Sequence, residues 1–153
     1  MKYLLIIFLV FGIKLSLHAA EQAMCPIMVT DEVDVEEVIE YQGKTIYMCC
    51  GGCVKVWKRN PDYYAAAAKA VQSDKPLLPQ LADVELPEVK LLKQRFCPLR
   101  EDTLVGPESP FIEYQGKKIY FYKERDIERK WSKDPEALFK AAREAGLLPQ
   151  FDE

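Results

Sequence analysis

Ile39-Glu40-Tyr41-Gln42-Gly43-Lys44-Thr45-Ile46-Tyr47 is the stretch that decides how this chain folds, because it occurs twice. Residues 112–120 read Ile-Glu-Tyr-Gln-Gly-Lys-Lys-Ile-Tyr, so eight of the nine positions are identical. Apolar residues alternate with polar ones before the Gln-Gly pair, which is the pattern of a half-buried strand, and β-forming residues follow it. Glycine accepts the positive φ that a tight turn needs. The sequence therefore predicts two equivalent β-hairpins.

The repeat extends beyond the hairpins, at an offset that drifts only between 70 and 74 residues. Three further matches are Cys25-Pro26-Ile27 with Cys97-Pro98-Leu99, Trp57 with Trp131, and Leu77-Leu78-Pro79-Gln80 with Leu147-Leu148-Pro149-Gln150. Matches that recur in the same order indicate one structural unit written twice. We place the first unit at residues 21–83, the linker at 84–95 and the second unit at 96–153.

Each unit is predicted to continue from its hairpin into two helices. Asn60-Pro61 and Asp134-Pro135 each combine an N-cap residue with proline at the first helical position. The alanine run at 65–68 then favours helix. The expected fold is α+β, with two small ββαα units in tandem. Units of this size have marginal cores, so a metal or a disulfide is expected to stabilise them.

The N-terminus has the pattern of a secretory signal peptide at residues 1–20. Lys2 gives a positive start, residues 4–13 are apolar, and Ala19-Ala20 offers a cleavage site before a polar stretch. Cleavage predicts a periplasmic or secreted protein without stable membrane insertion; the alternative is an uncleaved N-terminal anchor. Cleavage also removes His18, which is the single histidine of the chain.

Charge and composition exclude several classes of function. The net charge is −3, and Lys and Arg are scattered along the chain rather than gathered into a basic stripe. Nucleic acid is therefore not an expected partner. Without histidine, the mature chain has no Ser-His-Asp or Cys-His catalytic device and no histidine ligand for zinc. We expect the protein not to be an enzyme.

The cysteines carry the chemistry that remains. Cys49 and Cys53 are four residues apart where a strand gives way to a helix, so their sulfurs share one face of its first turn. The intervening hairpin can fold Cys25 back onto the same face. Three thiolates then converge. The candidates for a fourth ligand are Cys50, Met28 and Met48.

These residues resemble the YHS domain, a small heavy-metal-associated module related to the TRASH domain. The resemblance lies in Cys25-Pro26-Ile27-Met28, the Tyr-x-Gly-Lys of the hairpin, and the Cys-x3-Cys of Cys49 and Cys53. It implies a treble-clef-like cysteine knuckle that binds a soft or borderline metal through Cys25, Cys49 and Cys53. The family pattern does not require a cysteine at position 50.

The second unit departs from this pattern. Tyr122 stands at the position of Cys49, Lys123 at that of Cys50, and Asp126 near that of Cys53, so only Cys97 is retained. We therefore expect the second unit to be a structural or partner-docking copy. The alternative is that Cys97 reaches across to complete the first site.

Because thiolate ligands favour soft or borderline metals, we expect each chain to bind one Cu(I) or Zn(II) ion. The predicted role is metal sequestration, delivery or sensing, with a metal transporter or a metalloenzyme assembly protein as partner. Two alternatives remain at this point. Exported cysteines often pair as structural disulfides, and Cys50-Gly-Gly-Cys53 has the spacing of a thiol redox motif.

Overall fold

The computed structural model describes residues 22–152, and the predicted signal peptide at residues 1–20 lies outside them. The described chain forms three two-stranded antiparallel sheets, four α-helices and three short 3₁₀ helices, so the α+β class is confirmed. In the first unit the elements are β1 (Asp34–Tyr41), β2 (Lys44–Met48), α1 (Gly51–Trp57), α2 (Pro61–Lys69) and η1 (Pro79–Leu81). In the second they are β3 (Phe96–Cys97), β4 (Arg100–Leu104), β5 (Phe111–Tyr114), β6 (Lys117–Tyr120), α3 (Glu124–Arg129), η2 (Trp131–Lys133), α4 (Pro135–Glu144) and η3 (Pro149–Phe151).

Both predicted hairpins are present and close through the same turn. Strand β1 pairs with β2, and β5 pairs with β6. Gln42 and Gly43 have φ values of 51° and 70°, and Gln115 and Gly116 have 49° and 76°. Two consecutive positive φ values are typical of the type I′ turn, whose twist matches that of the flanking strands. The prediction from the repeated nonapeptide is confirmed.

A short antiparallel pairing precedes each hairpin and is absent from the predicted ββαα order. In the second unit it is the sheet of β3 and β4, in which Phe96 lies opposite Leu104. At the matching positions of the first unit, Met24 and Glu32 form an isolated bridge. Pairings of one or two residues are too short to produce an alternating pattern, so periodicity could not reveal them.

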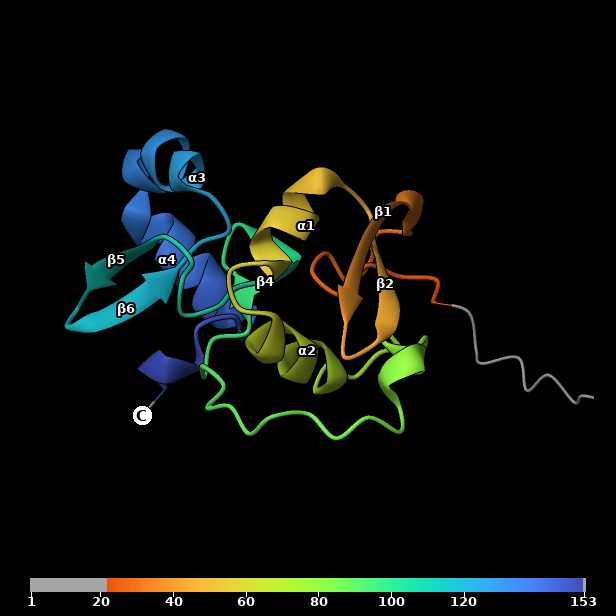
Figure 1. The fold of residues 1–153 in the computed structure, drawn as a ribbon. Coiled ribbons are helices and arrows are strands. Elements are labelled where there is room, and N and C mark those ends of the chain that lie inside the picture. The colour runs from red at the N-terminus through yellow and green to blue at the C-terminus, as the bar shows by residue number, and fades with distance from the viewer. Residues whose placement is uncertain (1–21, 153) are drawn as a thin grey trace, which may run out of the picture.

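The second helix of each unit begins as predicted. The Asn60 side chain accepts a hydrogen bond from the backbone N–H of Tyr63 at 3.2 Å, and Asp134 accepts one from that of Ala137 at 3.1 Å. Proline follows each cap, where its missing N–H costs nothing. Figure 1 shows the two hairpins at opposite ends of the molecule, with α1 and α2 between them.

The two units are joined by backbone hydrogen bonds. The N–H of Leu104 in β4 donates to the carbonyl of Ile27 at 2.8 Å, and the N–H of Val29 donates to the carbonyl of Asp102 at 2.9 Å. Met28 thereby forms a bridge with Thr103. The chain just after Cys25 is therefore held against the second unit, and β4 lies centrally in the molecule (Figure 1).

The buried side chains of both units form one continuous hydrophobic cluster. Matching aromatic pairs occur in each part: the rings of Tyr41 and Trp57 meet edge to face at 5.6 Å, and those of Tyr114 and Trp131 at 6.1 Å. Edge-to-face contacts of this kind stabilise a core beyond the area that they bury. A shared core also compensates for the small size of each unit.

A pair of glutamines fastens the ends of each unit to its hairpin. The amide of Gln22 donates to the carbonyl of Tyr47 at 2.8 Å, accepts from the N–H of the same residue at 3.0 Å, and accepts from Gln80 at 2.7 Å. Gln94 makes the same set with Tyr120 and Gln150, at 2.7, 3.0 and 3.2 Å. The repeat therefore includes polar contacts as well as apolar packing.

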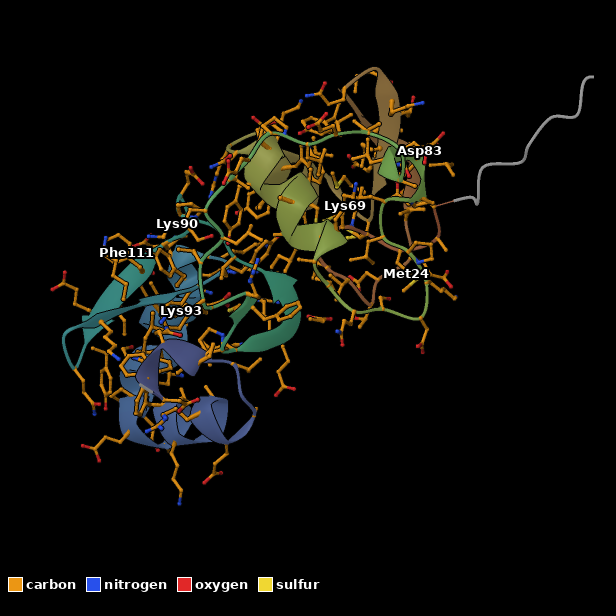
Figure 2. The ribbon with its side chains drawn as sticks, turned by 90° about the horizontal axis from the view of Figure 1, so that it is seen from below. Met24, Lys69, Asp83, Lys90, Lys93 and Phe111 are labelled. Carbon is orange, nitrogen blue, oxygen red and sulfur yellow. The ribbon has the colours of Figure 1, made fainter. Side chains whose placement is uncertain are left out.

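Residues 84–95, the predicted linker, contain no helix or strand. The Lys69 ammonium of α2 donates to the carbonyls of Leu81 and Val84, at 3.0 and 3.4 Å, and so holds the start of this segment against the helix. Figure 2 shows the segment running from Asp83 past α2 to Lys93. Among the described residues, no helix is both long and apolar enough to cross a membrane.

Candidate metal centre

Cys25 lies in a tight turn of backbone before β1. Its N–H donates to the carbonyl of Asp31 at 2.8 Å, and the N–H of Asp31 donates back to the carbonyl of Met28 at 2.9 Å. The N–H of Met28 also lies 3.5 Å from the Cys25 sulfur and donates to it. The turn thus fixes the direction of the Cys25 side chain and supplies a backbone donor to its sulfur.

Cys49, Cys50 and Cys53 lie at the junction of β2 and α1. Cys50 is the extended residue that precedes α1, and its carbonyl accepts from the N–H groups of Cys53 and Val54 at 3.0 and 3.2 Å. Cys49 precedes the helix and Cys53 lies in its first turn. The strand-to-helix junction therefore turns the sulfurs toward one another, as the spacing predicted.

The structure brings together the three sulfurs predicted as ligands. Those of Cys25, Cys49 and Cys53 all lie within 4.8 Å of one another, and Cys49 and Cys53 are 3.5 Å apart. Cys25 and Cys53 are buried and Cys49 is half-buried. Metal–sulfur bonds of about 2.3 Å place the sulfurs of a trigonal or tetrahedral site about 3.8–4.0 Å apart. The cluster therefore has dimensions that suit one ion.

Cys50 lies at the edge of this cluster. Its sulfur is 3.7 Å from that of Cys53 and 4.0 Å from that of Cys49, and the residue is half-buried. All five cysteines are free thiols in the described residues, so the structure shows none of the disulfides that one alternative invoked.

The remaining candidates are placed as follows. Met28 is half-buried and contacts the cluster through its backbone N–H, while Met48 is fully buried in the hydrophobic core. Cys97 is also fully buried. Its pKa is raised by burial, while the backbone of Tyr122 and Leu99 hydrogen-bonds to it and lowers the pKa. It is not part of the group of three sulfurs.

The cluster without an ion is polarised toward one thiolate. The pKa of Cys25 is lowered to about 6, first by the hydrogen bond with Cys53 and then by backbone donors, which outweigh burial. The pKa of Cys53 is raised by that same bond and by burial, and that of Cys49 is raised by burial and by the charge on Cys25. Burial also acts on Cys50, but the backbone N–H groups around it lower its pKa.

The matching pocket of the second unit contains an ion pair. The guanidinium of Arg100 donates to both carboxylate oxygens of Asp126, at 2.9 and 3.1 Å, and the Asp126 side chain is 3% exposed. Arg100 stands at the position of Met28, and Asp126 at that of Cys53. Burial raises the pKa of Asp126, but Arg100 lowers it more, so the carboxylate is charged at neutral pH.

Tyr122 is the residue at this site that the sequence analysis missed as a contributor. Its hydroxyl oxygen lies 3.9 Å from the Cys53 sulfur, although 69 residues separate the two in the chain. Its pKa is raised by burial and then by the negative charge that Cys53 can carry. Cys97, the alternative candidate from the second unit, lies outside the group of three sulfurs, whereas Tyr122 contacts one of them. In the sequence, the only indication of this contact was that Tyr122 occupies the position of Cys49 in the repeat.

Comparisons with known proteins return no family model, no curated protein and no solved structure that matches this chain.

Proposed function

We propose that the protein binds one soft metal ion, Cu(I) or Zn(II), through the thiolates of Cys25, Cys49 and Cys53. The observation that carries the proposal is the approach of these three sulfurs to within 4.8 Å of one another. Two of them are buried, and a buried cluster of thiols that can lose protons gains more from a cation than from solvent.

The ligand chemistry favours copper over harder ions. Thiolates select Cu(I) and Zn(II), whereas Ca²⁺ and Mg²⁺ require oxygen ligands. Three thiolates around Cu(I) complete a trigonal site, whereas Zn(II) would keep a fourth position open. Cys50 lies at 3.7 Å from Cys53 and is the nearest additional sulfur for a fourth ligand. We expect Cu(I) to bind more tightly than Zn(II).

The biological role that we propose is metal sequestration, delivery or sensing outside the cytoplasm. The predicted signal peptide and the resemblance to the YHS domain support it. An exported cluster of thiols meets oxidising conditions, and a bound ion would protect it from disulfide formation. A metal transporter or a metalloenzyme assembly protein is the kind of partner that exchanges such an ion.

A competition titration tests the proposal directly. The reduced protein is titrated in parallel against a Cu(I) chelator and a Zn(II) chelator, and unreduced protein is titrated with Ellman's reagent. We expect one ion per chain, with Cu(I) preferred. No competition at micromolar free metal, together with one free thiol in unreduced protein, would show that the cysteines are disulfide staples instead.

A second candidate function is thiol redox chemistry at Cys50 and Cys53. It is supported by their sulfur separation of 3.7 Å and by the lowered pKa of Cys50. Mass mapping of the oxidised protein separates it from metal binding: a reversible Cys50–Cys53 disulfide in a chain that holds no metal supports redox chemistry.

A further inference from the structure

Tyr122 lies at the end of the second unit's hairpin, yet its side chain belongs to the pocket of the first unit. The residue is 5% exposed, and its hydroxyl oxygen is 3.9 Å from the Cys53 sulfur. That separation is within reach of a hydrogen bond to sulfur, whose acceptor radius exceeds that of oxygen. A phenol keeps its proton at neutral pH and is therefore a donor.

Gly52 leaves the space through which the hydroxyl approaches. A Cβ atom at this position would lie 3.3 Å from the Tyr122 hydroxyl oxygen and 3.4 Å from the Cys50 sulfur. The first separation is tighter than most Cβ contacts and the second is at the lower limit of ordinary van der Waals contact, so a side chain here would require its neighbours to shift by a few tenths of an ångström. The first turn of α1 is thus shaped around the tyrosine as well as around its own cysteines.

The ring of Tyr122 is held from its own unit. The guanidinium carbon of Arg100 lies 5.7 Å from the ring centroid, and the ammonium of Lys123 lies 4.8 Å from it. Arg100 is itself fixed by its two hydrogen bonds to Asp126. Two cations within about 6 Å of the ring centroid stabilise the ring in its position. The ion pair of Arg100 and Asp126, at the positions of Met28 and Cys53, therefore helps to orient a group of the second unit toward the first.

We propose that Tyr122 is a positioning residue of the metal site, whose hydroxyl donates a hydrogen bond to the Cys53 thiolate. This inference rests on the metal site proposed above, and it makes that site dependent on both units. Groups that hydrogen-bond to metal ligands orient them and tune the metal, and their loss typically weakens binding by about 10–100-fold. The donor also offsets part of the negative charge that three thiolates bring together.

Co(II) is the probe for the test, because its thiolate charge-transfer and ligand-field bands report on the ligands directly. Reduced protein is titrated with Co(II) as wild type, as Tyr122→Phe and as Tyr120→Phe. The control makes the same change on a half-buried tyrosine whose ring packs against Phe111. We expect Tyr122→Phe to bind one Co(II) about 10-fold more weakly, with the charge-transfer band moved to lower energy because the thiolate has lost a donor. Tyr120→Phe should match the wild type.

Gly52→Ala provides a second test that retains the tyrosine. Its Cβ would push the hydroxyl by a few tenths of an ångström, so a red shift smaller than that of Tyr122→Phe is expected, while alanine favours the helix. Unchanged affinity and band position in Tyr122→Phe would overturn the inference and leave the metal site intact. A changed ligand-field pattern would also overturn it, because Tyr122 would then be a ligand. Absence of Co(II), Zn(II) and Cu(I) binding by the reduced wild type would instead refute the metal site itself.

Discussion

The two units place different chemistry in the same pocket. At the Cys-Pro turn and the strand-to-helix junction of the first unit, three sulfurs lie within 4.8 Å of one another. Under the matching turn of the second unit, the guanidinium of Arg100 is joined to the buried carboxylate of Asp126. The Gln-Gly turns and the side-chain caps of the second helices are the same in both units.

Under the proposed function, the difference accounts for a metal in the first unit and none in the second. In the second unit the positive charge is covalently part of the chain, and the bidentate pair satisfies its own hydrogen bonds. In the first unit, an ion from outside would supply the positive charge that complements the deprotonated thiolates. The second unit is then free to hold Tyr122 toward the first.

The largest expected effect is the loss of metal binding when a cysteine of the first unit, but not of the second, is replaced. Cys53→Ser removes one of three ligands and should abolish stoichiometric binding of Cu(I) or Zn(II) by the whole chain. Cys97→Ser, the matched control, should still bind one ion, because Cys97 lies outside the group of sulfurs. Metal content per chain after gel filtration measures both. Equal losses in the two variants would mean that the site is shared between the cysteines of both units.

The pH dependence of metal binding is the next largest effect. Cys25, with a pKa of about 6, is already a thiolate at pH 7, whereas the raised pKa values of Cys49 and Cys53 keep these two protonated. Binding must then release about two protons, so the affinity for Zn(II) should fall about 100-fold from pH 8 to pH 7. Chelator competition at both values checks this, after correction for the chelator's own protonation. A fall of 10-fold or less would contradict the polarised cluster.

Breaking the ion pair of the second unit should lower stability. Arg100→Met, which installs the residue type of position 28, leaves Asp126 buried without its partner. Because Arg100 is 26% exposed, we expect a loss of about 2 kcal/mol rather than the full cost of a deeply buried pair. Urea unfolding measures it. Arg100→Met with Asp126→Leu removes both charges and should recover most of the loss.

The stability that the Arg100–Asp126 ion pair contributes should depend on pH. The sign follows from the pKa of Asp126, which Arg100 lowers. A carboxylate with a lowered pKa stabilises the fold above its unfolded pKa, and the contribution disappears as the pH falls through the folded one. The stability difference between wild type and Arg100→Met should therefore be full at pH 6 and shrink below about pH 4. A difference that is constant down to pH 2 would mean that packing, not charge, is lost.

The smallest expected effect compares the two helix caps. Asn60→Ala and Asp134→Ala each remove a side-chain acceptor for a backbone N–H at 3.1–3.2 Å, and each should cost about 1 kcal/mol. The Asn60 amide also donates to exposed Glu108 at 2.8 Å. Thermal unfolding of both variants, with Glu108→Ala as the control, checks the comparison. A much larger loss at Asn60 that Glu108→Ala reproduces would show that the link between units outweighs the cap.

Sequence patterns within short segments were sufficient to predict much of the structure. The Gln-Gly turns follow from residues that tolerate positive φ, and the helix starts follow from Asn60-Pro61 and Asp134-Pro135. The gathering of the ligand cysteines was also predictable, because a strand-to-helix junction and a hairpin constrain where sulfurs can go. The pairing of β3 with β4 was missed because it is too short to have a period.

The sequence by itself determined the duplicated unit, its hairpins and caps, and the set of three cysteines in its first copy. Each of these depends on residues near one another in the chain or on a repeat that can be read directly. Only the tertiary structure decided how the units join, since the pairing of Met28 with Thr103 leaves no periodic signal. That junction brings Tyr122 beside Cys53, and it converts a position read as a lost ligand into a contact with the cluster. Contacts between units depend on how two surfaces dock, and that docking is a property of the shared core rather than of either segment.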